Sequence, residues 1–184
     1  KWGVQPGSYT HLTEFFGPVL GVMRFEKLHD AIALVNQTGY GLTSAIESLD
    51  DREQAEWKAG IRAGNLYINR GTTGAIVLRQ PFGGMGKSAF GPGLKAGGPN
   101  YVAQFMKFTE MRNAECGMRI EEALALYQPT WNAEFSREHD HFKLIGQDNV
   151  RRYLPVREMR VRIQAEDSEF DILARVAAAR TAGC

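Results

Sequence analysis

The chain has 184 residues, of which 43% are hydrophobic and 23% charged, and its formal net charge is +1 at pH 7. This length suffices for one hydrophobic core or for one domain with an appendage. The balanced charge gives no electrostatic argument for nucleic acid or for an acidic partner. The sequence also lacks an apolar run of about eighteen residues, the length of a membrane span, and residues 1–10 lack the apolar core of a signal peptide.

The first hundred or so residues predict strands that alternate with helices. Residues 18–25 are nearly all apolar, which is typical of a strand buried on both faces. A helix should follow, since Leu28, Ala31, Ile32 and Val35 have helical spacing.

A second strand is predicted over residues 42–48, and a third over 65–69. Between them, Asp50 and Glu53 have the spacing of a capping box ahead of a helix that runs to about Arg62. This alternation predicts an α/β fold with βαβ units and a mostly parallel sheet.

The segment around which the chain is organised follows the third strand directly. Residues 71–98 hold nine of the chain's twenty glycines. A flexible linker is the alternative, but Ile76, Phe82 and Phe90 make the segment too apolar for one. Because ligands of parallel sheets bind beyond the carboxyl ends of the strands, we expect a ligand loop here.

After about residue 100 the pattern changes, and we predict two domains, 1–109 and 110–184. Residues 120–127 have helical spacing, and Pro129 should end that helix. Residues 158–164 alternate as a strand with one solvated face. Ser168 and Asp171 have capping-box spacing ahead of a last helix that ends near Gly183. The second domain is therefore expected to be a small α+β extension.

Three motifs that suggest a site have simpler explanations. Gly86-Lys87-Ser88 ends like a phosphate-binding loop, but the glycine required five residues earlier is Pro81, so we reject that function. His139-Asp140-His141 suggests a metal site, yet a polar turn is favoured because no third ligand stands at a helical interval. The arginines in residues 151–162 suggest a basic patch, although a solvated strand face fits their alternation better.

The cysteines provide no defensible nucleophile. Cys116 has no local partner that would make it a thiolate, and Cys184 is terminal. Two cysteines so far apart suggest neither a disulfide framework nor a zinc site. We therefore predict no catalytic residue and no metal in this chain, and a cytoplasmic location.

Several motifs together resemble the aldehyde dehydrogenase superfamily. They are Glu14-Phe15-Phe16-Gly17-Pro18-Val19, Asn36-Gln-Thr-Gly-Tyr-Gly-Leu-Thr and Gly64-Asn-Leu-Tyr-Ile-Asn69. The glycine-rich segment narrows the resemblance to the L-glutamate γ-semialdehyde (Δ1-pyrroline-5-carboxylate) dehydrogenases. It is most similar to the form at the C-terminal end of bifunctional proline utilization A (PutA) proteins. The match spans residues 13–108.

The resemblance implies roles for six residues. Glu14 would hold the nicotinamide ribose hydroxyls of NAD, and Phe16 would pack near the nicotinamide ring. The backbone N–H groups of Thr73, Gly74 and Ala75 would bind the α-carboxylate of glutamate semialdehyde, as an anion nest does. Phe82 would line the aliphatic part of the substrate.

The family's nucleophile, general base and Rossmann NAD site lie upstream of the Glu14 motif, where this chain has thirteen residues. The resemblance therefore implies the C-terminal portion of an aldehyde dehydrogenase catalytic domain, inactive alone and partnered by the remainder of the enzyme. FAD would be present only if a proline dehydrogenase domain lies upstream, and a homo-oligomer stays open. Residues 110–184 resemble the extra domain of long PutA proteins, carried by Gly146-Gln-Asp-Asn149 and Arg152-Tyr-Leu-Pro155.

Two other functions stay open at this point. The chain could be a catalytically silent structural or lid domain, because no nucleophile is identified. An independent nucleotide-binding module would also fit the βαβ pattern and the glycine-rich loop. NADH formation by the isolated chain would contradict the first, and tight NAD⁺ binding would favour the second.

Overall fold

A βαβ unit lies at the centre of the N-terminal half. The computed structural model describes residues 1–76, 79–91, 93–107, 119–156 and 158–183, and the chain divides into two compact units, Lys1–Met106 and Lys107–Cys184. In the first unit, strand β2 (Thr43–Ile46) pairs in parallel with β3 (Asn65–Ile68). Helix α3 (Asp51–Gly60) connects these strands. The predicted strand–helix–strand order is confirmed.

Helix α3 begins where the sequence predicts. The Asp50 carboxylate accepts a hydrogen bond of 2.8 Å from the Arg52 N–H, one of the donors at a helix start that has no partner within the helix. At the other end, the Asn36 side chain donates to the Gly60 carbonyl (2.9 Å) and accepts from the Arg62 N–H (2.8 Å). The helix therefore stops at Gly60, two residues before the predicted end.

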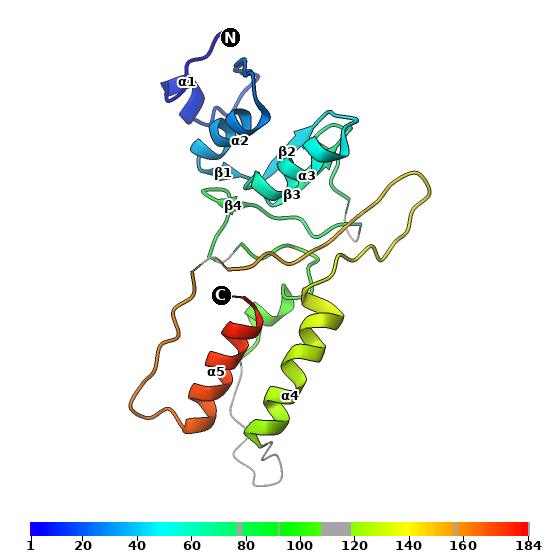
Figure 1. Cartoon of the computed structure of the whole chain (residues 1–184). Helices are drawn as coiled ribbons and strands as arrows, with labels where there is room; N and C mark the ends of the chain where they lie inside the picture. Colours follow the sequence, from blue (N-terminus) through cyan, green and yellow to red (C-terminus); the bar gives the residue numbers. More distant parts are fainter. Residues whose placement is uncertain (77–78, 92, 108–118, 157, 184) are drawn as a thin grey trace. The chain divides into compact units, whose positions relative to one another are not determined.

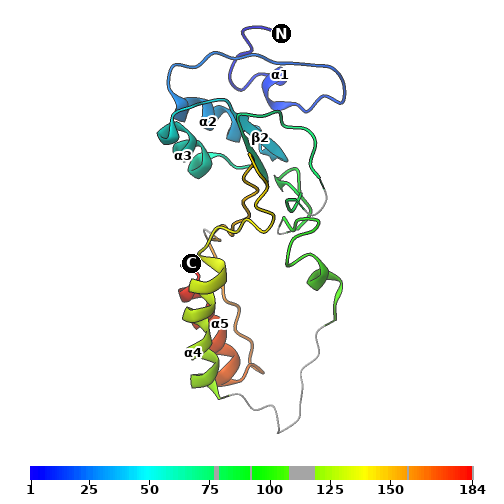
Figure 2. The same cartoon turned by 90° about the vertical axis from the view of Figure 1, so that its right-hand side faces the viewer.

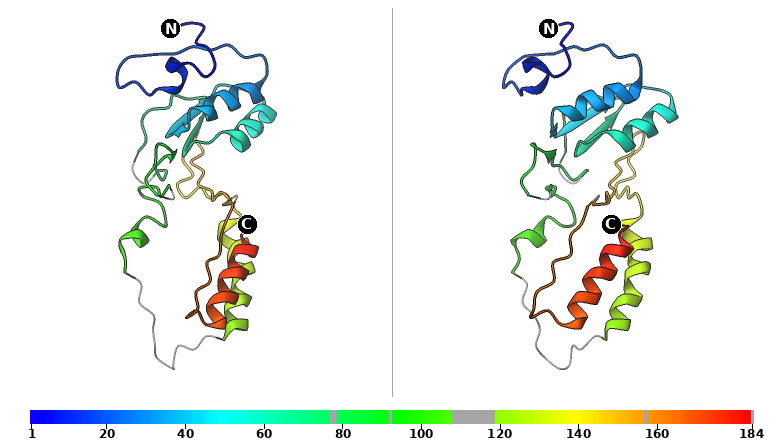
Figure 3. Two further views of the ribbon diagram at one scale, coloured as in Figure 1. Left: turned by 90° about the vertical axis from the view of Figure 1, so that its left-hand side faces the viewer. Right: turned by 60° about the vertical axis from the view of Figure 1, so that its left-hand side comes forward.

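The core of the first unit lies between two helices and one face of the β2–β3 pair. Helix α2 (Leu28–Gln37) packs against α3, and Figure 3 shows the two helices next to β2. Its predicted apolar positions do not all turn inward, since Val35 is 46% exposed. The buried core residues are Ile32, Trp57 and Ile61, with Leu28, Ile46, Leu66 and Ile68 packed against them. Burying an isoleucine side chain such as Ile32 or Ile61 stabilises the fold by about 1.5–3 kcal/mol.

The strand predicted over residues 18–25 is not formed. Val22 makes one isolated parallel bridge with Trp2. Leu20 and Phe25 are 73% and 57% exposed. The prediction was wrong because strand structure needs a paired neighbour, and within the described residues this segment finds only that single bridge. A short helix, α1 (Tyr9–Leu12), precedes it.

The glycine-rich segment folds back within the first unit, against β1. Strand β4 (Met85–Gly86) pairs antiparallel with β1 (Tyr40–Gly41), and Phe82 forms an antiparallel bridge with Ala96. The 3-10 helix η1 (Val102–Phe105) follows. This antiparallel pairing was not predicted, because two-residue strands leave no period in the sequence.

In the second unit, two helices lie side by side (Figures 1 and 2). Helix α4 (Ile120–Thr130) was predicted to end at Pro129, which is wrong: Pro129 lies inside it, and the chain continues as the π-helix η3 (Trp131–Phe135). Proline removes one helical hydrogen bond, and the wider π turn that follows accommodates the change. Helix α5 (Glu169–Thr181) begins with the predicted capping box of Ser168 and Asp171.

The strand predicted over residues 158–164 is absent: the described residues there have no strand structure, and Met159 and Ile163 are 46% and 56% exposed. The bridge between His139 and Arg151 is isolated. Arg151 also departs from the predicted solvated strand face, since its side chain is 13% exposed and contacts Glu134. None of the helices in the described residues has the length and apolarity needed to cross a bilayer.

Candidate functional site

The predicted carboxylate-binding loop, Thr73-Gly74-Ala75, is exposed and directly follows β3 and a short connection. Gly74 has a φ of 82°, a backbone conformation that strains any residue with a Cβ atom. Within the described residues, neither the Gly74 N–H nor the Ala75 N–H donates to a protein acceptor. These N–H groups are therefore available to an anion.

Arg70 fixes the start of this loop. Its Nη2 atom donates a hydrogen bond of 3.1 Å to the Thr73 carbonyl. Its guanidinium carbon lies 4.9 Å from the ring centre of Tyr67, a cation–π distance. Because Tyr67 is 3% exposed, Arg70 is anchored on a buried ring.

Phe82 is half-buried, and hydrogen bonds hold the backbone of Phe82 and of both its neighbours. Its N–H donates to the Ala96 carbonyl (3.0 Å), and its carbonyl accepts from the Ala96 N–H (2.9 Å). The Asn65 side chain donates to the Pro81 carbonyl (3.0 Å) and accepts from the Gly83 N–H (3.1 Å). Both peptide groups that flank Phe82 are thus bound by one buried carboxamide.

Lys95 also stabilises the Phe82 turn. Its ammonium group donates to the carbonyls of Gly64 and Gly83, the latter at 2.7 Å. Burial lowers the pKa of this lysine to about 8. Because a lysine nitrogen carries two hydrogens even when neutral, both hydrogen bonds survive deprotonation.

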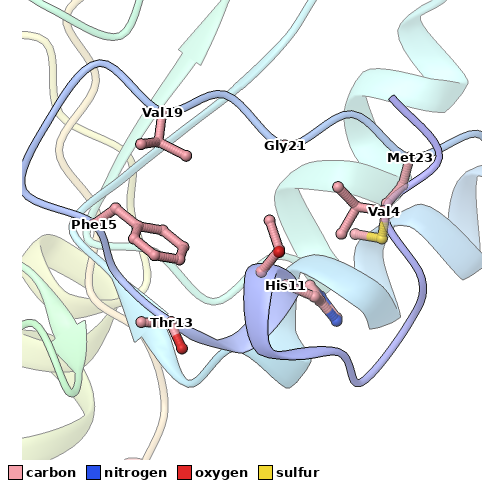
Figure 4. A pocket seen from close by; sticks show the side chains of 8 residues that line it. Val4, His11, Thr13, Phe15, Val19, Gly21 and Met23 are labelled. Atoms are coloured by element: carbon pink, nitrogen blue, oxygen red, sulfur yellow. The ribbon is translucent and has the colours of Figure 1, made fainter. Parts of the chain in front are cut away.

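The predicted cofactor residues lie on the segment after α1. Glu14 is exposed, and the Phe16 side chain is 97% exposed. The neighbouring Phe15, which packs edge-on against Tyr9 at 5.8 Å, lines a pocket of about 250 Å³ instead. Figure 4 shows Phe15 and Val19 at one side of this pocket and Val4 and Met23 at the other.

The six predicted residues thus form two groups. Thr73, Gly74, Ala75 and Phe82 are joined through the side chains of β3. By contrast, no hydrogen bond, ion pair or ring contact in the described part of the chain connects Glu14 or Phe16 to that group. An exposed carboxylate and an exposed aromatic ring are chemically suited to a ribose and a nicotinamide, and both are unengaged by the described residues.

Gly86-Lys87-Ser88 has a structural role in this chain. The Lys87 ammonium donates to the Thr38 carbonyl (3.0 Å) and lies 5.0 Å from the ring centre of Tyr40. The Ser88 hydroxyl accepts a hydrogen bond from the Gly41 N–H (3.1 Å). These contacts tie β4 to the end of α2.

His139-Asp140-His141 forms a polar turn, as favoured. Asp140 accepts hydrogen bonds from the N–H groups of Phe142, Lys143 and Asn149, each at 3.0 Å. The Asn149 N–H bond is the largest of the contacts that lower the pKa of Asp140. In the described residues, no group of three or more His, Cys, Asp or Glu side chains could hold a metal ion. Cys116 and Cys184 lie outside those residues.

Three functional candidates were missed in the sequence: Asn65, Tyr67 and Arg70. The sequence signal that could have found Asn65 and Tyr67 is the alternation of side chains along the predicted strand. Asn65 and Tyr67 are two residues apart, so they share one face of β3, and a polar carboxamide there must find partners if it is buried. Their partners lie 13 to 18 positions further along, a separation that periodicity does not reveal.

Comparison with known proteins shows which proteins this chain resembles. The bifunctional protein PutA of Rhizobium meliloti is 48% identical over 95 residues, which are 50% of this chain and 8% of that protein. The structure of PutA from Corynebacterium freiburgense aligns with 99% of this chain and 20% of its own, at 40% identity and a TM-score of 0.80. A 1-pyrroline-5-carboxylate dehydrogenase from Thermus, solved with bound NAD, aligns with 58% of this chain and 20% of its own, at 36% identity and a TM-score of 0.53.

This chain therefore spans about a fifth or less of the length of these relatives. The similarity to solved structures confirms the predicted α/β fold, as a partial aldehyde dehydrogenase domain. The model of the aldehyde dehydrogenase family matches residues 1–111, more than half of the chain. The chain belongs to the aldehyde dehydrogenase family.

Proposed function

We propose that this chain is the C-terminal part of an NAD-dependent L-glutamate γ-semialdehyde dehydrogenase, which oxidises the semialdehyde to glutamate in proline degradation. Similarity to PutA over 99% of the chain supports the proposal, as does the similarity to a 1-pyrroline-5-carboxylate dehydrogenase. In this proposal residues 1–109 belong to the catalytic domain and 110–184 to a PutA-like extension. A cytoplasmic location stays a prediction.

One observation carries the substrate assignment. The N–H groups of Gly74 and Ala75, which donate to no acceptor in the described part of the chain, lie in the same glycine-rich segment as Phe82. Glutamate semialdehyde has an α-carboxylate, a short aliphatic chain and an aldehyde. The N–H groups would bind the carboxylate, and the Phe82 ring would pack against the aliphatic chain.

This chain's residues orient the substrate and would not themselves attack it. Glu14 would accept hydrogen bonds from ribose hydroxyls, and Phe16 would cover one face of the nicotinamide. A bound nicotinamide cofactor would accept the hydride released when the aldehyde is oxidised. The attacking nucleophile is expected in the remainder of the enzyme, so the isolated chain is proposed to have no turnover.

The test uses the full-length enzyme that carries this sequence and records NADH formation with glutamate semialdehyde. Phe82→Asp should lower kcat/KM at least about tenfold, because a carboxylate replaces the surface offered to the aliphatic chain, and tenfold corresponds to about 1.4 kcal/mol. Leu49→Asp is the matched control, since Leu49 is 94% exposed and lies outside the glycine-rich segment. An inactive wild-type enzyme, or a Phe82→Asp variant as active as wild type, would contradict the proposal.

A further inference from the structure

We infer that Asn65 and Tyr67 of β3 are positioning residues that set the carboxylate-binding loop and Phe82 in a fixed relation. They thereby determine selectivity for an aldehyde that carries a carboxylate at its other end. The inference rests on the proposed function and extends it to two residues that would not touch the substrate. Three steps of geometry support it.

Asn65 fixes the Phe82 turn. Its side chain is 5% exposed and uses both the donor and the acceptor of its carboxamide on that turn. The Ala96 bridge holds Phe82 itself, and Lys95 holds the Gly83 carbonyl. A leucine at position 65 would keep the side-chain volume and lose both hydrogen bonds, leaving the Pro81 carbonyl and Gly83 N–H without these partners.

Tyr67 connects this turn to the carboxylate-binding loop. Its hydroxyl accepts a hydrogen bond of 3.0 Å from the Gln80 side chain, two residues before Phe82. Its ring lies under the Arg70 guanidinium, which in turn donates to the Thr73 carbonyl. The buried Tyr67 side chain thus contacts two residues: Gln80, next to the Phe82 turn, and Arg70, next to the carboxylate-binding loop.

The strand provides a rigid base for both side chains. Asn65 and Tyr67 lie on one face of β3, and both are buried. On the other face, Leu66 and Ile68 pack against the core formed by α2 and α3. Alternation in the strand therefore assigns one face to the proposed substrate site and the other to the core.

This geometry gives positioning residues a specific signature. A loop and a turn that shift relative to each other should impair a substrate that contacts both of them more than one that contacts only the turn. Glutamate semialdehyde would contact both, whereas propanal has no carboxylate. The ratio of kcat/KM for these two aldehydes therefore reports positioning, and general loss of folded enzyme cancels from it.

The experiment measures that ratio in the full-length enzyme for wild type, Tyr67→Phe, Asn65→Leu and Leu66→Ala. Tyr67→Phe removes only the hydroxyl and should lower the ratio at least about fivefold, mainly through KM for the semialdehyde. Asn65→Leu should lower it further. Leu66→Ala, on the opposite face of β3, should reduce thermal stability and leave the ratio within about twofold of wild type.

The outcomes separate this inference from the proposed function. A wild-type enzyme that oxidises propanal but not glutamate semialdehyde would contradict the proposed function. If the wild-type enzyme oxidises the semialdehyde but Tyr67→Phe leaves the ratio of the two kcat/KM values unchanged, the positioning role alone is overturned. An equal decrease in the ratio for Leu66→Ala would overturn it too, because fold stability would then explain the effect. Tyr67→Phe decides the question if Asn65→Leu does not fold.

Discussion

The guanidinium of Arg70 lies 4.9 Å from the ring centre of Tyr67, and the same guanidinium donates to the Thr73 carbonyl. An exposed surface loop is thereby attached to a side chain that is 3% exposed. The attachment matters because the loop's own residues, 71–76, are all exposed and have little other support.

Replacing Arg70 should therefore loosen the carboxylate-binding loop. Arg70→Leu removes one hydrogen bond and one cation–π contact, each worth about 0.5–1.5 kcal/mol. We expect a lower ¹⁵N order parameter at Gly74 in this chain, with unchanged values in α3. Arg79→Leu, whose side chain is also exposed, is the control. Equal order parameters at Gly74 in the two variants would contradict the attachment.

The glycine at position 64 should be irreplaceable for steric reasons. A Cβ atom there would overlap the Gly83 carbonyl oxygen and lie 2.7 Å from the Lys95 nitrogen. Gly64→Ala should therefore lower the free energy of unfolding by about 1–3 kcal/mol. A Cβ at Gly71 would meet nothing within 4 Å, so Gly71→Ala should be nearly neutral. Urea unfolding of the two variants checks this, and equal stabilities would contradict the steric explanation.

The buried Lys95 should make the free energy of unfolding depend on pH. Burial lowers its pKa in the folded chain to about 8, against 10.5 for an ordinary lysine. Between these values the unfolded chain binds more protons, so stability should rise as pH increases from about 8 to 10.5. Below pH 8 both states are protonated, and this contribution no longer changes with pH.

Lys95→Met should remove that rise. Because solvent screens a partly exposed group, we expect the stability difference between wild type and variant to change by about 1 kcal/mol over this range. Urea unfolding at pH 7.5 and pH 10 measures it, and the other lysines cancel in the difference. A difference that does not depend on pH would mean that the Lys95 pKa is ordinary.

Glu134 should stabilise the second unit. Its carboxylate accepts hydrogen bonds from the Tyr153 hydroxyl (2.8 Å) and from Arg151 Nη2 (3.0 Å). The Tyr153 hydrogen bond is the largest of the contacts that lower the pKa of Glu134. Glu134→Gln should lower the free energy of unfolding by about 1–2 kcal/mol at pH 7, because the Arg151 side chain, 13% exposed, loses its charge partner.

The pH dependence of this effect has a defined sign. A carboxylate whose pKa is lowered by folding contributes stability above its unfolded pKa, which is 4.5 here, and loses it as pH falls through the folded value. The difference between wild type and Glu134→Gln should therefore shrink below pH 4.5. Glu138→Gln is the control, since Glu138 is more exposed and its nearest contact to Arg152 is 4.0 Å. A comparable loss in the control would contradict a specific role for Glu134.

Local sequence signals predicted the regular elements well wherever chemistry and periodicity agreed. The caps Asp50 and Ser168 fixed the starts of α3 and α5, because a side-chain oxygen followed by a helix is a short-range signal. The strands predicted over 18–25 and 158–164 are not formed. Periodicity reports which faces are apolar, whereas a strand also needs a partner, which local sequence does not specify.

In the candidate site, too, local motifs were predictable and long-range contacts were not. The resemblance predicted residues 73–75 and Phe82 from motifs contiguous in the chain. The contacts that support them, from Asn65 to Gly83 and from Tyr67 to Gln80, join residues far apart in sequence. Hydrogen bonds of this kind follow from tertiary packing, so the supporting residues could be found only in the structure.

The central claim is that the glycine-rich segment binds the substrate's carboxylate and aliphatic chain. A crystal structure of the full-length enzyme with bound L-glutamate, the proposed product, tests it most directly. We predict the α-carboxylate within hydrogen-bonding distance of the N–H groups of Gly74 and Ala75, with the aliphatic chain against Phe82. Glutamate bound with its α-carboxylate away from residues 73–75 would contradict the account.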